Sequence, residues 1–301
     1  MKKRITTVLL GFLFVFSFTA VAQSNRAQSA RFPAKKSDVQ KVKERTLLVA
    51  LTGSPGVDES LKKVIPQIWD FSETEFVAAD NIASVMDGNK KEYAVLSSNI
   101  ITIKQAATIG SPVSEYLRFA IRLAEKYQKR KSIYYQDVII NQKDDNIYLE
   151  PREVYVGIYK ILNHYEAKLE NEKLMDAFVK NAGKLEKRTL LIQKDLLDKG
   201  ITKSKIAEIY PYPFELVEPA KIDKAVMDQD EKYAFVHLVP VGTATNMMMH
   251  EIYDCKDGQI LTSGEANNGA FDRYSNLINK DHLKAYVKNY DRLNRWAEKR
   301  K

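Results

Sequence analysis

An internal repeat limits what this chain can fold into more than any other feature of its sequence. The tetrapeptide Arg-Thr-Leu-Leu begins at Arg45 and again at Arg188. Further matches follow in the same order: residues 77–87 resemble residues 217–228, both ending in Val-Met-Asp, and Tyr-Ala begins at Tyr93 and at Tyr233. We interpret these collinear matches as a duplication, the alternative being two unrelated α/β segments that share a common pattern.

Each copy shows the same succession of predicted strands and helices. An apolar strand opens the copy, at 45–51 and at 188–192, and an amphipathic closing helix ends it. Asp257-Gly258 is a strong hairpin signal, and Asp145-Asn146 lies at the matching place in the first copy. We therefore predict an α/β (α+β) fold of two duplicated modules of order β-α-β-α-β-β-α, with helices packed on mixed sheets.

The first copy carries an extra segment. The offset between matched residues falls from 140 at Tyr93 to 113 at Lys143, so the first copy has 27 additional residues. Ser111 and Pro112 are suitable for the start of a helix. Apolar residues then follow at helical spacing, namely Val113, Tyr116, Leu117, Ala120, Ile121, Ala124 and Tyr127. This pattern predicts a helical insertion at about 105–131.

The amino terminus has the three parts of a secretory signal peptide. Lys2, Lys3 and Arg4 precede an apolar run, and Ala20-Val21-Ala22 supplies the small residues of a cleavage site. We predict a signal peptide at 1–22, a flexible basic leader at 23–42, a first module at 43–183 and a second at 184–301. The alternative is an uncleaved anchor, but the apolar run is short for a membrane span. No later stretch is apolar enough to cross a bilayer.

The net charge and the single cysteine bear on the expected partners and on the expected disulfides. The formal net charge is +8, and cleavage would remove three of the positive charges. The remaining basic residues are spread along the chain, so we do not expect nucleic acid as a partner of an exported protein. The single cysteine, Cys255, excludes an intrachain disulfide. We expect export to the periplasm or the medium, and Cys255 to be a buried thiol.

The sequence offers no catalytic constellation and no metal motif. There are four histidines, and none has the spacing of a known ligand pair. His237 and His250 could face each other across a hairpin, which makes them the least unsuitable metal candidates. No nucleophile-elbow or phosphate-loop motif is present. We predict no catalytic residue, no metal and no cofactor.

One loop has features of a ligand site. Gly53, Ser54 and Gly56 follow the first predicted strand and precede a helix. Such loops bind anions through backbone N–H groups at a helix amino terminus, although Pro55 removes one donor. Gly53, Ser54 and Gly56 are the candidate ligand-binding residues, and a simple helix-entry turn is the alternative.

The order of elements is similar to that of the bacterial envelope modules of the TolB amino-terminal and CsgG-like kind. Residues 93–96 (Tyr-Ala-Val-Leu) and 253–258 (Tyr-Asp-Cys-Lys-Asp-Gly) carry this resemblance. It implies binding or assembly in the envelope and transfers no site residue.

Three functions therefore remain open. The first is a non-enzymatic binding or assembly protein of a bacterial envelope, which acts through contacts with a protein partner of unknown identity. The second is a small-ligand binding protein with a site between the modules. The third is a hydrolase whose acidic residues are dispersed in the sequence.

Overall fold

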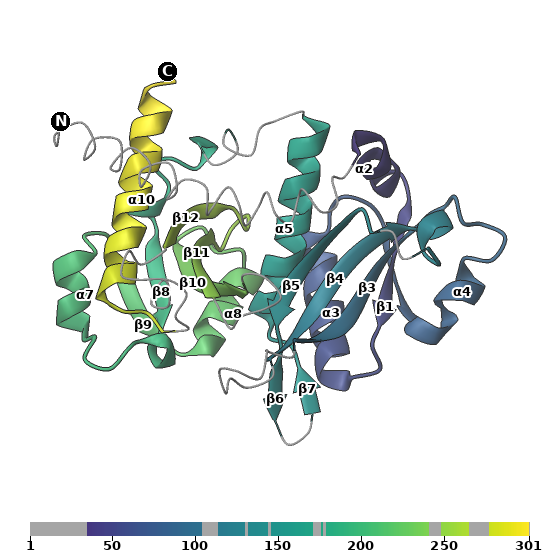
Figure 1. Ribbon diagram of the computed structural model, residues 1–301, viewed down its shortest axis with the longest axis horizontal. Helices are drawn as coiled ribbons and strands as arrows, with labels where there is room; N and C mark the ends of the chain where they lie inside the picture. The colour runs from purple at the N-terminus through teal and green to yellow at the C-terminus, as the bar shows by residue number, and fades with distance from the viewer. Residues whose placement is uncertain are drawn as a thin grey trace, which may run out of the picture.

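The computed structural model describes residues 35–103, 114–129, 132–143, 146–170, 176, 179–240, 248–264 and 277–300. Within these ranges the chain forms two five-stranded mixed sheets and one two-stranded hairpin (Figure 1). The predicted signal peptide and residues 23–34 of the leader lie outside the described residues. None of the helices in the described ranges is long and apolar enough to span a membrane.

The first sheet has the strand order β2-β1-β3-β4-β5. Its strands are β1 (Thr46–Leu51), β2 (Thr74–Ala78), β3 (Tyr93–Ile103), β4 (Ser114–Leu123) and β5 (Tyr134–Ile139). β1 is parallel to both β2 and β3, whereas β4 and β5 are antiparallel to their neighbours. The four central residues of β1 are buried, as expected for a parallel strand covered on both faces. The module also contains α3 (Pro55–Ile68), α4 (Ile82–Val85) and α5 (Pro151–Leu169).

The second sheet repeats this arrangement as β9-β8-β10-β11-β12. Its strands are β8 (Thr189–Gln193), β9 (Phe214–Val217), β10 (Tyr233–Pro240), β11 (Met248–Asp254) and β12 (Ile260–Gly264). Its helices are α7 (Lys203–Ile209), α8 (Pro219–Met227) and α10 (Lys280–Glu298). The predicted α/β class with two similar modules is confirmed. Counting both strands of the predicted hairpin, the order of the second module is β-α-β-α-β-β-β-α.

The predicted helical insertion at about 105–131 is wrong. Residues 114–123 form β4, which lies between β3 and β5 in the first sheet. Leu117 and Phe119 are buried on the face that packs against α5, and Tyr116 and Ala120 are buried on the other face. Because both faces of β4 are buried, apolar residues occur at helical spacing as well as at alternating positions. The helical spacing therefore does not indicate a helix here. Ser111 and Pro112 lie outside the described residues.

The repeat predicts that the hairpin at Asp145-Asn146 is equivalent to the hairpin at Asp257-Gly258, but the structure shows that it is not. Ala94 pairs with Leu123, and the matching Ala234 pairs with Asp254, so β4 corresponds to β11. β5 therefore corresponds to β12. The hairpin of β6 (Asn141–Lys143) and β7 (Asn146–Tyr148) is an addition to the first module.

The last part of the predicted flexible leader is helical. Residues 36–43 form α2 (Lys36–Lys43), and its side chains Val39 and Val42 are fully buried. α2 packs against α5, which explains why a largely polar segment is ordered there.

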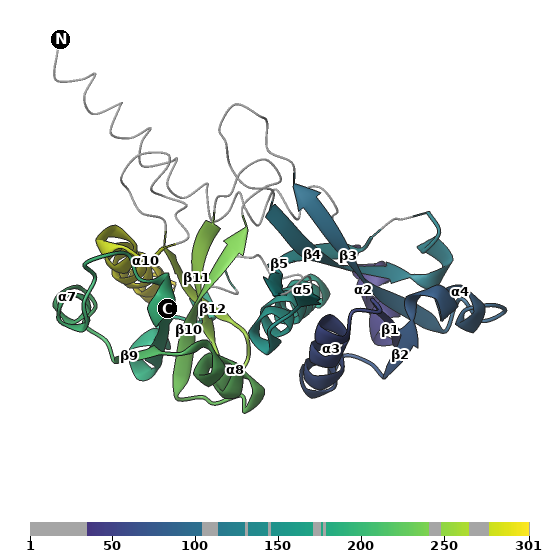
Figure 2. The ribbon, with the colours of Figure 1, turned by 90° about the horizontal axis from the view of Figure 1, so that it is seen from below.

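Helix α5 joins the two modules into one body. It packs on α3 and β5 of the first module and on α8 of the second. Figure 2 shows α5 between the two sheets, while α10 covers the far face of the second sheet. Leu47 of β1, Ile158 of α5 and Phe235 of β10 belong to one continuous hydrophobic core. The two sheets are therefore separate, but their modules share a core.

Candidate functional site

The loop that follows β1 is held by the carboxylate of Asp58 in the first turn of α3. Asp58 Oδ1 accepts hydrogen bonds from the backbone N–H of Thr52 at 2.7 Å and from its hydroxyl at 2.9 Å. Asp58 Oδ2 accepts from the N–H of Gly53 at 3.0 Å. The N–H groups that would bind an anion are therefore occupied by a carboxylate. The positive φ of Gly53, 83°, fits this turn.

The other two candidate residues of this loop contact the β6–β7 hairpin. The Ser54 hydroxyl donates to the backbone oxygen of Ile147 at 2.9 Å. A Cβ atom at Gly56 would lie 2.8 Å from Cβ of Tyr148, so only glycine allows the hairpin to approach α3 this closely. These contacts favour the helix-entry turn over an anion site, and the ligand role of Gly53, Ser54 and Gly56 stays a prediction.

A pocket of about 300 Å³ nevertheless opens beside this loop. It lies beside the carboxyl end of β1, where β3 continues beyond its neighbour. Since the chain passes from β1 to β2 on one side and to β3 on the other, this is the topological switch point of the sheet. Ligands of α/β proteins usually bind at such points. The described residues of its lining are all uncharged: Ala50, Leu51, Thr52, Ser54, Val57, Ala79, Ser97, Ser98, Asn99, Ile100, Leu117, Tyr127 and Ile147. Of the candidate residues, only Ser54 contributes to it.

Two pocket residues on β3 were missed by the sequence analysis. Ser98 Oγ is buried and makes no hydrogen bond to the described residues. Ile100 is 47% exposed, and no other large apolar side chain is exposed among the residues whose burial the structure describes. Neither residue belongs to a motif, and only the tertiary structure places them beside the loop after β1.

The two histidine candidates cannot share a metal ion. β10 and β11 pair so that His237 lies opposite Glu251, and His250 lies opposite Leu238. Adjacent positions on a strand point to opposite faces, so the expectation that His237 and His250 face each other is wrong. His250 Nδ1 lies 2.7 Å from the Tyr286 hydroxyl, and its ring stacks on His282 at 3.9 Å between centroids. In the described ranges, His, Cys, Asp and Glu side chains form no cluster of metal-binding geometry.

Ionisable side chains are instead buried between α5 and the second sheet. Lys160 Nζ lies 2.8 Å from Glu251 Oε2, and these side chains are 8% and 1% exposed. The hydroxyl of Tyr253 donates to the same carboxylate oxygen. His237 Nε2 lies 3.4 Å from Glu153 Oε2, and both residues are buried. These groups fix the position of α5 on the sheet.

Burial changes the pKa values of the second pair in opposite directions. Desolvation raises the pKa of the Glu153 carboxyl to about 8, although the nearby Arg152 guanidinium opposes this shift. Desolvation lowers the pKa of His237 to about 3, and the positive charges of Lys160 and Arg152 contribute. At neutral pH, Glu153 is therefore mostly protonated and His237 is neutral, so their contact is not an ion pair.

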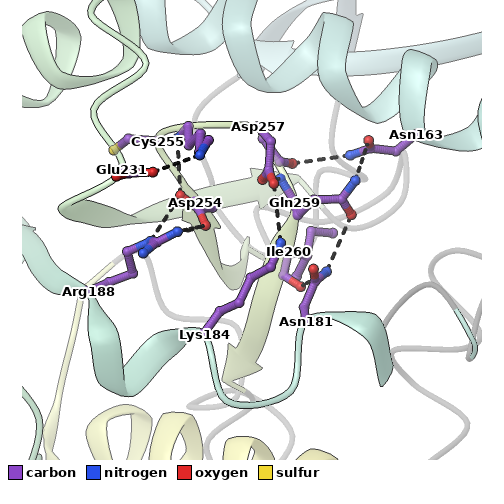
Figure 3. A network of polar contacts seen from close by, with 12 residues as sticks. Asn163, Asn181, Lys184, Arg188, Glu231, Asp254, Cys255, Asp257, Gln259 and Ile260 are labelled. Carbon is purple, nitrogen blue, oxygen red and sulfur yellow. Dashed lines mark hydrogen bonds and ion pairs between the residues drawn. The ribbon is translucent and has the colours of Figure 1, made fainter.

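A second polar network surrounds the turn between β11 and β12 (Figure 3). Asn163 of α5 donates to the backbone oxygen of Gly258 at 3.2 Å and accepts from Gln259 at 2.9 Å. Asn181 donates to Gln259 at 3.3 Å, and Lys184 lies 3.2 Å from Asp257. The segment from Asp254 to Gly258, which the sequence marks as a turn, therefore docks on α5 and on the connection that leads to β8.

Cys255 lies in this turn and is a buried free thiol, as expected. The Tyr155 hydroxyl of α5 donates to the backbone oxygen of Cys255 at 2.6 Å. Burial raises the pKa of the Cys255 thiol, and neighbouring carboxylates add to the shift. These surroundings disfavour the thiolate that a nucleophile needs.

Comparison of the chain with protein families, with curated proteins and with solved structures found no match. The resemblance to the TolB amino-terminal and CsgG-like modules therefore stays a prediction based on the sequence.

Proposed function

We propose that the protein is an exported, non-enzymatic binding protein of a bacterial envelope that acts through contacts with a protein partner. The signal-peptide pattern supports export to the periplasm or the medium.

The observation that carries this proposal is the position of α5. A ligand site between the modules needs a cleft that can open around its ligand. Here the described residues of that boundary are packed: Tyr155 bonds to Cys255, and Lys160 pairs with the buried Glu251. The hydrophobic core that continues across this boundary favours a rigid body over a hinged receptor.

The character of the pocket also favours binding over catalysis. General acid–base chemistry needs a titratable side chain within hydrogen-bonding distance of the substrate. The described lining of the pocket beside β1 has one titratable side chain, the phenol of Tyr127, and no carboxylate, imidazole or amine. The buried carboxylates Glu153 and Glu251 lie at the module boundary and are not among the pocket residues. This distribution gives the hydrolase alternative no support.

Mild cross-linking in the native envelope tests the proposal. The tagged full chain is recovered, its partner is identified by mass spectrometry, and the purified pair is mixed and analysed by size-exclusion chromatography. We expect one specific partner that forms a complex of defined stoichiometry. Recovery of the chain alone from a soluble fraction would overturn the proposal.

A further inference from the structure

Strand β3 is longer than the partner on one of its edges. β3 extends from Tyr93 to Ile103, but β1 pairs with it only from Tyr93 to Leu96. On the opposite edge, β4 pairs with β3 up to Ile103. No strand in the described part of the chain pairs with the β1-side edge beyond Leu96. An unpaired strand edge presents N–H and C=O groups to which another extended chain can bind.

The pocket occupies the place that a strand beside this edge would take. It is bounded by the end of β1 (Ala50, Leu51) on one side and by residues 97–100 of β3 on the other. The buried Ser98 hydroxyl, which has no partner among the described residues, contributes to its wall. The exposed Ile100 extends the apolar lining to the surface of the molecule.

The chemistry of this pocket selects an uncharged ligand. An anion would meet the Asp58 carboxylate, which already takes the N–H groups of Thr52 and Gly53. None of the described lining residues carries a charge that could pair with a cation or a carboxylate. Apolar groups flanked by hydrogen-bonding groups fit the described lining, and the volume of about 300 Å³ has room for more than one side chain.

We propose that the free edge of β3 and the pocket beside it form the docking site for an extended, uncharged segment of the partner protein. This inference rests on the function proposed above. The segment adds a strand to β3 through main-chain hydrogen bonds, and one of its apolar side chains enters the pocket. A peptide can pair in series with the main-chain N–H and C=O groups of β3 beyond Leu96, which a small molecule in the pocket cannot do.

Synthetic peptides test the site without knowledge of the partner. The probe is acetyl-Thr-Val-Leu-Val-Thr-amide, and the readout is NMR of the mature chain with methyl-labelled isoleucine. The methyl signals of Ile100 and Ile147, which both line the pocket, should shift on titration. Replacing the central leucine by aspartate should weaken binding about tenfold or more, because an apolar contact is lost and an unpaired charge is introduced.

Backbone methylation separates strand addition from simple pocket filling. Two further peptides carry N-methyl groups on alternate residues and keep every side chain. Because a strand bonds to its neighbour through alternate residues, one of these peptides should lose binding and the other should keep it. Equal binding by both would overturn strand addition.

Adjacent alanines provide matched variants of the protein. Ala78 and Ala79 are both exposed, but only Ala79 lines the pocket. Ala79→Phe should block the pocket and weaken peptide binding about tenfold or more, whereas Ala78→Phe should leave it unchanged. Equal affinity of both variants, or failure of the probe to shift Ile100 and Ile147, would overturn the proposal. If the probe binds only after removal of residues 23–34, the chain's own leader is the occupant and the partner segment is excluded.

The two proposals can fail separately. A captured partner whose binding is unaffected by Ala79→Phe would leave the binding function intact and exclude this docking site. In the opposite case, the peptide binds, Ala79→Phe weakens its binding and Ala78→Phe does not, but no partner is recovered from the envelope. That result would overturn the proposed function and leave β3 as a peptide-binding edge.

Discussion

Arg188 and Asp254 form a bidentate ion pair at the start of β8 and the end of β11. Arg188 Nη2 lies 3.0 Å and Nε 3.2 Å from Asp254 Oδ2, and the Asp254 side chain is fully buried. The first module has a counterpart: Arg45 Nη1 lies 2.6 Å from Glu125 Oε2, but Glu125 is 34% exposed. The arginine of the repeated Arg-Thr-Leu-Leu motif therefore pairs with a carboxylate in both modules.

This difference in burial gives the first prediction. Arg188→Ala leaves an unpaired buried carboxylate and should lower the free energy of unfolding by about 3–5 kcal/mol. Arg45→Ala removes a pair whose carboxylate reaches solvent, and should cost about 1 kcal/mol. Urea unfolding followed by circular dichroism measures both. Equal losses would show that burial of the carboxylate does not set the strength of these pairs.

A double-mutant cycle on Lys160 and Glu251 tests the contact between α5 and the second sheet. Lys160→Met alone should destabilise the protein by about 3–5 kcal/mol, because it leaves Glu251 charged and buried. Adding Glu251→Gln removes that charge and should recover at least about 1 kcal/mol. If the two substitutions simply add, Lys160 and Glu251 are not coupled.

The pH dependence of stability should report on Glu153. Its pKa is raised from 4.5 to about 8, so the folded state keeps a proton that the unfolded state loses. The stability that this provides is complete below about pH 4.5 and is lost as the pH rises through 8. Glu153→Gln keeps the size and removes this dependence, so the variant should gain about 2–5 kcal/mol on the wild type between pH 5 and pH 8. The free energy of unfolding of both proteins is measured by urea titration at several pH values. If it changes with pH equally in both, the pH dependence does not come from Glu153.

His237 should act in the opposite pH range. Its pKa is lowered from 6.5 to about 3, so the stability it provides is present above pH 6.5 and is lost as the pH falls towards 3. His237→Gln, which cannot be protonated, should unfold at a lower pH than the wild type in an acid titration. An unchanged acid midpoint would exclude His237 as a main cause of acid unfolding.

Two glycines with similar backbone conformations should respond differently to alanine. Gly53 has φ 83° and open space around it, so Gly53→Ala should cost about 1–2 kcal/mol from the left-handed conformation alone. Gly258 has φ 61°, and a Cβ atom there would collide with the Tyr159 ring of α5. Gly258→Ala should therefore cost clearly more than Gly53→Ala in thermal unfolding. Similar melting temperatures would mean that the turn does not press on α5.

Much of the fold could be predicted from local patterns. The apolar run at Arg45–Leu51 and the Asp257-Gly258 turn are properties of neighbouring residues, and each indicated its element correctly. The collinear repeat indicated two similar modules but matched the wrong hairpins. Residues 114–123 were mistaken for a helix because both faces of β4 are buried, and the choice between the two periods depends on what packs there. The face on which each histidine lies depends on strand register in the same way.

The sequence by itself determined that the chain is α/β, that its plan is repeated, and that a turn follows Asp254. Only the tertiary structure decided that α5 serves both modules, that His237 and His250 lie on opposite faces, and that Ser98 and Ile100 lie beside the end of β1. The physical reason is the range of the interactions. Strand and turn preferences act between neighbouring residues, whereas the pocket and the buried charges arise from packing between residues far apart in the sequence, such as Lys160 and Glu251.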